Sequence, residues 1–191
     1  MPDWKPKTVY VTYIAAPPEK VWAALTSAEF TRQYFGGLTI EVEPKTGGAF
    51  AFRYPDGRIH ISGKVVEWSP PRRFACTWLV EGMKDFAELP ECLVTYEIEP
   101  AGEAVKLTMT ETHSWDVPPS ILAGGQSGWP AILSSLKTLL ESGKPLAVNQ
   151  AVQWPLVELQ TEAQMVRLLV RFAASELDNS HHMEVSDKVS M

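Results

Sequence analysis

The sequence predicts an α+β fold in which a curved antiparallel sheet of about six to seven strands wraps around one long helix. Three observations support this prediction. Apolar residues alternate with a period of two through most of the stretch 39–112, which is typical of half-buried strands. A strand and a short helical segment precede that stretch, and a strongly amphipathic segment at 127–142 follows it. Because an antiparallel sheet with one apolar face needs a cover, the amphipathic segment is expected to pack on that face.

The first elements are indicated by residue type. Residues 7–15 are β-branched and aromatic, so they predict the first strand. The prolines at 17–18 end that strand and suit the first turn of a short helix that runs to about Ser27. Ser27 is also placed to cap a second helical turn, which the glycine pair at 36–37 ends.

Six further strands are expected from the alternation and from the turn residues between them. The Asp-Gly pair at 56–57 is a strong signal for a two-residue hairpin, and the prolines at 70–71 separate two strands. Gly63 suggests a bulge or a bend within its strand. The expected ranges are 39–43, 49–54, 58–68, 73–80, 93–99 and 105–112.

The long helix is predicted over residues 127–142. Its apolar side chains recur at intervals of three and four from Trp129 to Leu140, which places them along one face. Ser127 is a suitable N-cap, and Gly143 is a suitable residue to end the helix.

The chain divides by composition into a domain of residues 1–146, a helical extension at 147–178 and a polar tail at 179–191 that is expected to be disordered. A second helix is predicted over 161–177, with apolar residues on more than one stripe. A helix this apolar is expected to be buried. Two ways of burying it remain open, namely docking on its own domain and forming a homodimer through residues 158–177.

Charge and cysteine content exclude several classes of partner. The 191 residues include 17 basic and 23 acidic side chains, a net charge of −6, which argues against binding nucleic acid or a membrane surface. A hairpin centred near residue 86 would place Cys76 opposite Tyr96, about 13 Å from Cys92, so no disulfide is expected. Two reduced thiols and no recognisable export signal predict a cytoplasmic protein.

Two polar residues extend the apolar face of the last strand. If Val105, Leu107 and Met109 face the interior, then Glu111 and His113 share that face by alternation. A carboxylate and an imidazole in an apolar space have shifted pKa values, and they can orient a ligand or act as acid and base. The alternative is that the strand twists or ends at Glu111, which leaves both side chains at a solvated rim.

Aromatic residues from several elements are expected to meet the inner face of the sheet and, with two leucines of the long helix, to wall a cavity for a flat apolar guest. Plain core packing is the alternative for each of them. These candidates are Phe30, Tyr34, Phe50, Phe52, Trp78, Trp115, Trp129, Leu133 and Leu136.

Motifs for metal, cofactor or nucleophilic chemistry are not recognisable in the sequence. It lacks paired cysteines or histidines at zinc-ligand spacing, a phosphate loop and a dinucleotide fingerprint, so neither a metal nor a cofactor is predicted. It also lacks the Gly-x-Ser-x-Gly nucleophile elbow, and no catalytic residue is assigned.

Short motifs occur in a fixed order along residues 7–146. They are Val21-Trp22, 47–50, 56–57, 63–67, 70–74, Thr77-Trp78, Leu107-Thr108 and Gly128-Trp129. Their order resembles the helix-grip fold of the START and birch-pollen-allergen (SRPBCC) superfamily. Within that superfamily, the pattern is similar to the family named after the activator of heat-shock protein 90 ATPase, in its C-terminal-domain form.

The resemblance implies an internal, largely apolar cavity between the sheet and the long helix, and it associates the chain with the stress response. The expected function is non-enzymatic binding of a hydrophobic or aromatic small molecule in that cavity. One alternative is a cyclase, dehydratase or hydrolase-like enzyme that uses Glu111, His113 or Arg53. A second alternative is a co-chaperone-like module that acts by binding another protein.

Overall fold

The computed structural model describes residues 5–82, 86, 89–146, 165–167 and 170–171. The chain divides into two compact units, residues 1–146 and 147–191. Residues 165–167 and 170–171, within the helix predicted over 161–177, are helical. The remainder of that helix and the tail at 179–191 lie outside the described residues. Within the described part of the chain, no helix combines the length and the apolar character needed to cross a membrane.

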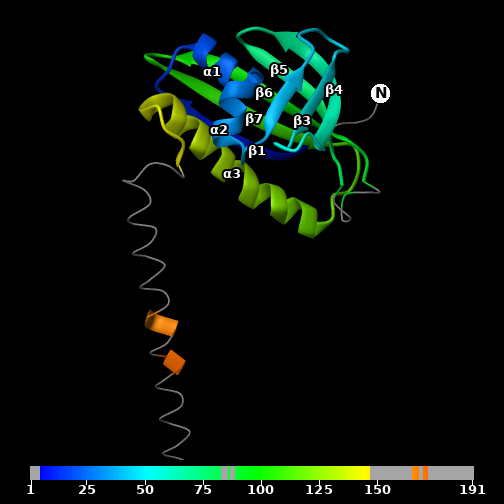
Figure 1. Ribbon diagram of the computed structural model, residues 1–191, viewed down its shortest axis with the longest axis vertical. Coiled ribbons are helices and arrows are strands. Elements are labelled where there is room, and N and C mark those ends of the chain that lie inside the picture. The colour runs from blue at the N-terminus through cyan, green and yellow to red at the C-terminus, as the bar shows by residue number, and fades with distance from the viewer. Residues whose placement is uncertain (1–4, 83–85, 87–88, 147–164, 168–169, 172–191) are drawn as a thin grey trace, which may run out of the picture. The chain divides into compact units, whose positions relative to one another are not determined.

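The unit of residues 1–146 is built on a seven-stranded antiparallel sheet in the order β1-β7-β6-β5-β4-β3-β2 (Figure 1). The α+β prediction is therefore confirmed, with the upper of the two expected strand numbers. The strands are β1 (Lys5–Ile14), β2 (Thr39–Val42), β3 (Ala49–Arg53), β4 (Ile59–Ser69), β5 (Arg73–Val80), β6 (Cys92–Ala101) and β7 (Ala104–His113).

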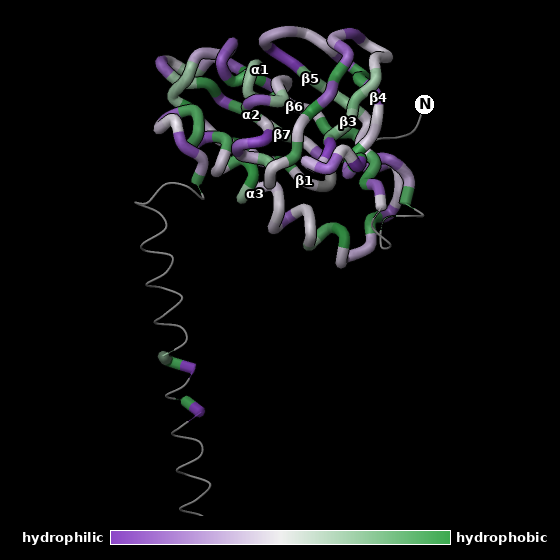
Figure 2. Tube along the Cα trace, viewed as in Figure 1, coloured by the Kyte–Doolittle hydropathy of each residue, from purple (hydrophilic) through white to green (hydrophobic). Residues whose placement is uncertain are grey.

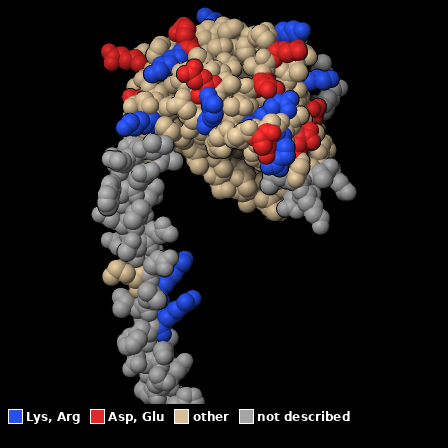
Figure 3. All heavy atoms as spheres, viewed as in Figure 1, with Lys and Arg blue, Asp and Glu red and all other residues tan. Residues whose placement is uncertain are grey.

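The alternation of apolar residues sets the inner face of the sheet. Val105, Leu107 and Met109 of β7 are almost completely buried, and Val94 and Ile98 of β6 lie in the same core. Figure 2 shows hydrophobic and hydrophilic residues interleaved along the strands and the long helix, as half-buried elements require. On the face seen in Figure 3, acidic and basic side chains are intermixed over the outside of this unit.

Three helices complete the unit: α1 (Pro18–Thr26), α2 (Ala28–Tyr34) and α3 (Pro119–Ser142). The predicted end of the second helical turn is correct, because Gly36 and Gly37 adopt φ angles of 62° and 83° that other residues rarely tolerate. In Figure 1, α3 runs along one side of the sheet.

The predicted start of the long helix is wrong by eight residues. Helix α3 begins at Pro119 rather than after Ser127, and the Ser127 hydroxyl donates to the Gly124 carbonyl at 3.0 Å inside the helix. The glycines at 124, 125 and 128 have low helix propensity, which is why the sequence pattern pointed to a later start. Proline at the first helical position starts the helix instead, since its missing N–H needs no partner there.

Two details of the sheet also differ from expectation. Strand β5 pairs Cys76 with Val94, not with Tyr96, because the connection between β5 and β6 is centred one residue earlier than predicted. Both cysteines are free and buried. The interruption expected at Gly63 extends beyond that residue. Gly63 and Lys64 have no partner in the pairing with β5, register shifts lie on either side of them, and the Gly63 backbone passes very close to that of Thr77.

Candidate functional site

A cavity of about 350 Å³ lies between the inner face of the sheet and the first half of α3. Most of its lining is aromatic or aliphatic, and its polar side chains are His60, Cys92, Glu111 and His113. The complete lining is Phe35, His60, Ile61, Trp78, Leu79, Val80, Phe86, Leu89, Pro90, Cys92, Glu111, His113, Trp115, Ile121, Gly124, Gly125, Gly128, Trp129 and Ile132.

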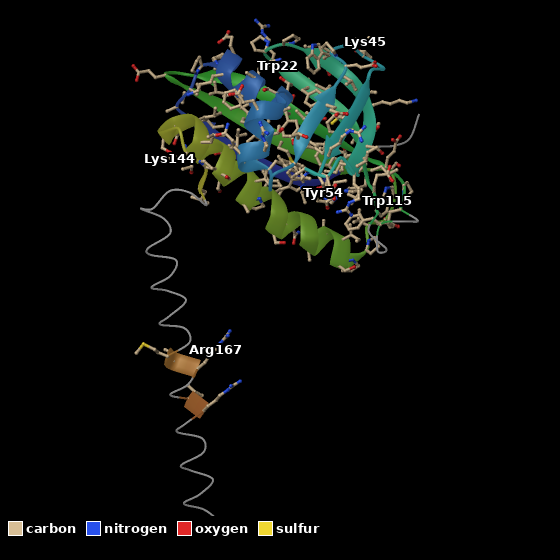
Figure 4. All side chains as sticks on the ribbon, in the orientation of Figure 1. Trp22, Lys45, Tyr54, Trp115, Lys144 and Arg167 are labelled. Atoms are coloured by element: carbon tan, nitrogen blue, oxygen red, sulfur yellow. The ribbon has the colours of Figure 1, made fainter. Side chains whose placement is uncertain are left out.

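Five of the predicted site residues line this cavity, namely Trp78, Glu111, His113, Trp115 and Trp129. They come from β5, from β7, from the segment between β7 and α3, where Figure 4 labels Trp115, and from α3 itself.

The other predicted site residues pack in the core and do not line the cavity: Phe30, Tyr34, Phe50, Phe52, Leu133 and Leu136. The reason is that aromatic rings fill the middle of the interior. Phe35 stacks on Phe52 with ring centroids 4.5 Å apart, and Phe50 lies 5.5 Å from Trp78. The open space is therefore left beside this aromatic cluster, toward the N-terminal half of α3.

Glu111 and His113 face the interior, so the interpretation as a solvated rim is wrong. The side chain of Glu111 is 16% exposed and that of His113 is 4% exposed. Strand β7 stays extended through His113 and pairs with a neighbour on each side, with Glu111 opposite Thr8 of β1 and Val94 of β6. Pairing on both sides prevents the twist that would have turned the two side chains outward.

The Glu111 carboxylate accepts hydrogen bonds from three different elements. Its Oε2 atom accepts from the Trp129 indole Nε1 at 2.9 Å and from the Thr8 hydroxyl at 3.3 Å. Its Oε1 atom lies 3.1 Å from His113 Nε2. Helix α3 also passes close to this carboxylate one turn before Trp129, since a Cβ added at Gly125 would lie 3.4 Å from Oε2. The network holds the carboxylate in one orientation at the wall of the cavity.

The charge state of the site follows from this network. Burial acts to raise the pKa of Glu111, but the hydrogen bonds from His113 and Trp129, together with the positive charge of His113, hold that pKa below its ordinary value. Burial, with the negative charge of Glu111 as a smaller cause, raises the pKa of the Cys92 thiol. Glu111 is thus an ionised carboxylate beside a neutral thiol.

Cys92 is the functional candidate that the sequence interpretation missed. Its Sγ atom lies 3.8 Å from Glu111 Oε1. Alternation could have found it, because Cys92 precedes Val94, Tyr96 and Ile98 at a spacing of two on the inner face of β6.

Two buried nitrogens at the site have no hydrogen-bond partner within the described part of the chain. They are Nδ1 of His113 and Nε1 of Trp115. The two rings meet edge to face, with centroids 5.0 Å apart. Buried polar atoms are usually paired in native structures, so these two are available to a group that enters the cavity.

Comparison with known families identifies the chain. The family model described as "Activator of Hsp90 ATPase homolog 1-like protein" matches residues 15–141, well over half of the sequence. The chain belongs to this family. The match spans the elements from α1 to α3, so the family resemblance noted from the sequence motifs is confirmed.

Solved structures show the same fold. DynU16, a protein of the dynemicin biosynthetic locus, is 26% identical with a TM-score of 0.61, and the match covers 75% of this family member and 49% of DynU16. This chain therefore spans about half the length of DynU16. An Aha1 protein from Colwellia psychrerythraea, solved as a dimer, is 20% identical with a TM-score of 0.55, covering 71% and 96% of the two chains. An Hsp90 activator from Plasmodium falciparum, PFC0360w, is 23% identical with a TM-score of 0.56, covering 70% and 94%.

Two other comparisons do not assign the chain to a further family. The family model for the C-terminal domain of acyl-CoA dehydrogenase matches residues 121–191, which is less than half of the chain and overlaps the first match along α3. None of the curated proteins compared with the chain matches it.

In this Hsp90-activator-like chain, Arg53 is not part of the candidate site. Its guanidinium pairs with Glu41 at 2.7 Å and donates to the Gly57 carbonyl at 3.0 Å, and it does not line the cavity. The expectation that Arg53 serves an enzyme in this cavity is therefore wrong. What remains is an anionic carboxylate, an imidazole and a thiol gathered at one side of an aromatic cavity, an arrangement that can bind and orient a mostly apolar molecule.

Proposed function

We propose that the chain binds a hydrophobic or aromatic small molecule in the cavity beneath α3, without turning it over. The cavity itself supports this proposal, since about 350 Å³ falls within the range of small-molecule sites. The indole rings of Trp78, Trp115 and Trp129 offer wide apolar walls, which suit a flat guest.

The polar side of the cavity narrows the class of guest. Glu111 Oε2 is already engaged by Trp129 and Thr8, whereas Oε1 contacts His113 and, beyond that, only the Cys92 thiol at 3.8 Å, a weak donor that a stronger donor in the cavity can replace. A guest that is apolar over most of its surface and carries one hydroxyl or N–H donor would satisfy that oxygen. A guest with a carboxylate at the same position would be repelled.

Filling the cavity is expected to abolish binding. A Cβ at Gly125 would lie 3.4 Å from Glu111 Oε2, an ordinary contact, so the helix accepts a side chain that then extends into the cavity. We expect Gly125→Leu to lower guest affinity at least about tenfold while the helix remains as stable or gains up to about 1 kcal/mol. Native mass spectrometry, followed by denaturing extraction, identifies the guest and measures its occupancy in the variant.

The matched control is Ala123→Leu, which adds a similar side chain at an exposed position of α3 that does not line the cavity. We expect it to retain the guest at near-equal stoichiometry. Equal occupancy in both variants would contradict the proposal. A protein that carries no guest but forms a stoichiometric complex with an Hsp90-type ATPase would favour the co-chaperone-like alternative.

An enzyme that uses the same cavity is the second candidate, favoured by the buried contact between Glu111 and His113. A carboxylate 3.1 Å from an imidazole can exchange a proton with a bound molecule. Conversion of the extracted guest by the purified protein, lost in Glu111→Gln and in His113→Ala but kept in Arg53→Ala, would establish it.

We also propose that residues 158–177 form a homodimer contact. Met165, Val166 and Val170 are 56%, 59% and 64% exposed, and contiguous apolar surface of this kind is typical of a protein–protein contact. Figure 4 labels Arg167, which belongs to the same helical segment. In light scattering coupled to size exclusion, we expect a dimer mass for the full chain and a monomer mass for the double variant Val166→Glu, Val170→Glu.

The control for the dimer is Val9→Glu with Val11→Glu, two equally exposed apolar positions on β1. This variant is expected to keep the dimer mass. A monomeric wild-type chain, or loss of the dimer in the control alone, would contradict the proposal.

A further inference from the structure

Cys92, Glu111 and His113 bring three potential metal-ligand atoms together at the wall of the cavity. One sulfur, one carboxylate oxygen and one ring nitrogen all lie within 4.8 Å of one another. The strands that carry them are adjacent, and pairing of Leu93 with Thr112 places the three residues at the same end of the β6–β7 ladder. The backbone positions are thus held by the sheet.

We propose that Cys92, Glu111 and His113 bind a divalent transition-metal ion, for which zinc fits the donor set best. Binding displaces the Cys92 thiol proton to solvent, and the resulting thiolate sulfur, the imidazole nitrogen and the carboxylate oxygen are the ligand types that zinc uses in proteins. Only one of the three donor atoms is an oxygen, which argues against calcium and magnesium, since both prefer all-oxygen sites.

Two of the three separations between donor atoms agree with a tetrahedral ion, and the third, between the Cys92 sulfur and the His113 ring nitrogen, lies within 4.8 Å where such an ion requires about 3.6 Å. Zinc bond lengths at tetrahedral angles require about 3.3 Å between the nitrogen and oxygen ligands and about 3.6 Å between the sulfur and oxygen ligands. The measured separations are 3.1 Å from His113 Nε2 to Glu111 Oε1 and 3.8 Å from Cys92 Sγ to the same oxygen. Side-chain shifts of a few tenths of an ångström therefore bring these two pairs to coordination geometry.

The surroundings of the carboxylate provide the support that metal ligands usually have. The Trp129 indole and the Thr8 hydroxyl both donate to Oε2, which leaves Oε1 directed at Cys92 and His113. Hydrogen bonds of this kind orient a ligating carboxylate and raise the affinity of the site.

Among the described residues, one ring nitrogen of His113 is unpaired with or without the ion. His113 is 4% exposed, and its Nδ1 atom has no hydrogen-bond partner within the described residues. The contact of Nε2 with Glu111 Oε1 leaves Nδ1 as the ring nitrogen without a partner in this part of the chain. An ion on Nε2 takes the electron pair of that atom and places the ring proton on Nδ1, which is then a buried N–H donor open to a molecule in the cavity.

Three protein ligands leave one position of a tetrahedral ion open. Because all three residues line the cavity, that position faces the space in which a guest would lie. Zinc sites with three protein ligands and an open position bind water or another small oxygen or nitrogen donor there. The metal proposal does not depend on a guest, since every ligand in it is a protein group. An ion on Glu111 Oε1 would take the place of the donor group of a guest at that oxygen, and a guest would then bind at the open position of the ion.

Cobalt substitution of the full-length chain tests the site directly. After removal of metals with a chelator, Co²⁺ is expected to bind with one-to-one stoichiometry and to give a thiolate-to-cobalt charge-transfer band together with the intense visible absorption of tetrahedral cobalt. Added Zn²⁺ is expected to displace it and remove both absorptions. A wild-type protein that shows no thiolate-to-cobalt band overturns the proposal, whether or not any variant folds.

Variants assign the ligands. We expect Cys92→Ser to lose the charge-transfer band and His113→Gln to weaken Zn²⁺ binding at least about tenfold in calorimetric titration. Cys76→Ala is the matched control, since Cys76 is a second buried cysteine outside the cluster, and it is expected to bind as the wild type does. Persistence of the band in Cys92→Ser, or its loss in Cys76→Ala, overturns the proposal.

Two further variants test whether metal binds at the tail histidines instead and whether Trp129 positions the Glu111 ligand. Replacing His181 and His182 with alanine is expected to leave the affinity unchanged, and loss of binding in that variant would show a tail site instead. Trp129→Phe removes the indole N–H and keeps an aromatic ring. It is expected to weaken Zn²⁺ binding about 10- to 100-fold while keeping the charge-transfer band, because Trp129 positions the carboxylate without touching the ion.

Discussion

Replacing Glu111 with alanine is expected to lower the free energy of unfolding by about 2 to 4 kcal/mol, measured by urea denaturation in a buffer that contains a chelator. The substitution removes the acceptor of the Trp129 indole and of the Thr8 hydroxyl, and it removes the partner of His113. These groups lie around a side chain that is only 16% exposed, so water replaces the lost contacts incompletely. The cost therefore reflects buried donors left without partners.

The matched control for this prediction is Glu97→Ala on the neighbouring strand β6. Glu97 also forms an ion pair, with Arg73 at 2.9 Å, but its side chain is 40% exposed. An exposed pair of this kind contributes about 1 kcal/mol or less. If Glu111→Ala costs no more than Glu97→Ala, the network does not stabilise the fold in the way described.

Replacing Gly63 with alanine is expected to destabilise the domain by more than about 3 kcal/mol in the same denaturation experiment. An added Cβ would lie 2.0 Å from the Thr77 carbonyl oxygen and 2.7 Å from its carbon. Both atoms belong to the backbone of the adjacent strand, so the clash is relieved only by separating β4 from β5. Those strands carry Ile61 and Trp78, and the cavity is expected to lose its shape as well.

Gly124→Ala is the control for Gly63, because it makes the same chemical change where nothing lies within 4 Å of the added atom. Within helix α3, this change is expected to be neutral or to stabilise by up to about 1 kcal/mol. A Gly63→Ala protein that unfolds at the same urea concentration as Gly124→Ala would contradict the close approach of the two strands.

The strand pattern and the site were predictable to different degrees. The alternation along 105–112 placed Glu111 and His113 on the inner face, provided that the strand continued. Whether it continued depended on pairing with both β1 and β6, which a local pattern does not report. Cys92 was accessible to the same argument from alternation. The residue opposite Cys76 could not be predicted in this way, because it depends on the length of the connection between β5 and β6.

The zinc-type cluster illustrates why motif spacing is a poor guide here. Cys92 and Glu111 are separated by nineteen positions and lie on different strands. Their proximity comes from the register of the β6–β7 hairpin and has no counterpart in a short linear motif. Trp129 of helix α3 is a second example of residues that are distant in the sequence and meet at the site. It is eighteen positions from Glu111, and its indole reaches the carboxylate because the helix packs beside the end of β7.

The sequence by itself determined the fold class, the order of the elements and the inward face of most strands, because periods of two and of three to four follow directly from local geometry. The tertiary structure alone decided which aromatic residues fill the core and which line the cavity. Phe52 and Trp78 are both buried aromatic residues on inner faces, yet only Trp78 borders open space. The difference arises because Phe35 stacks on Phe52, and such a contact depends on how distant elements pack against each other.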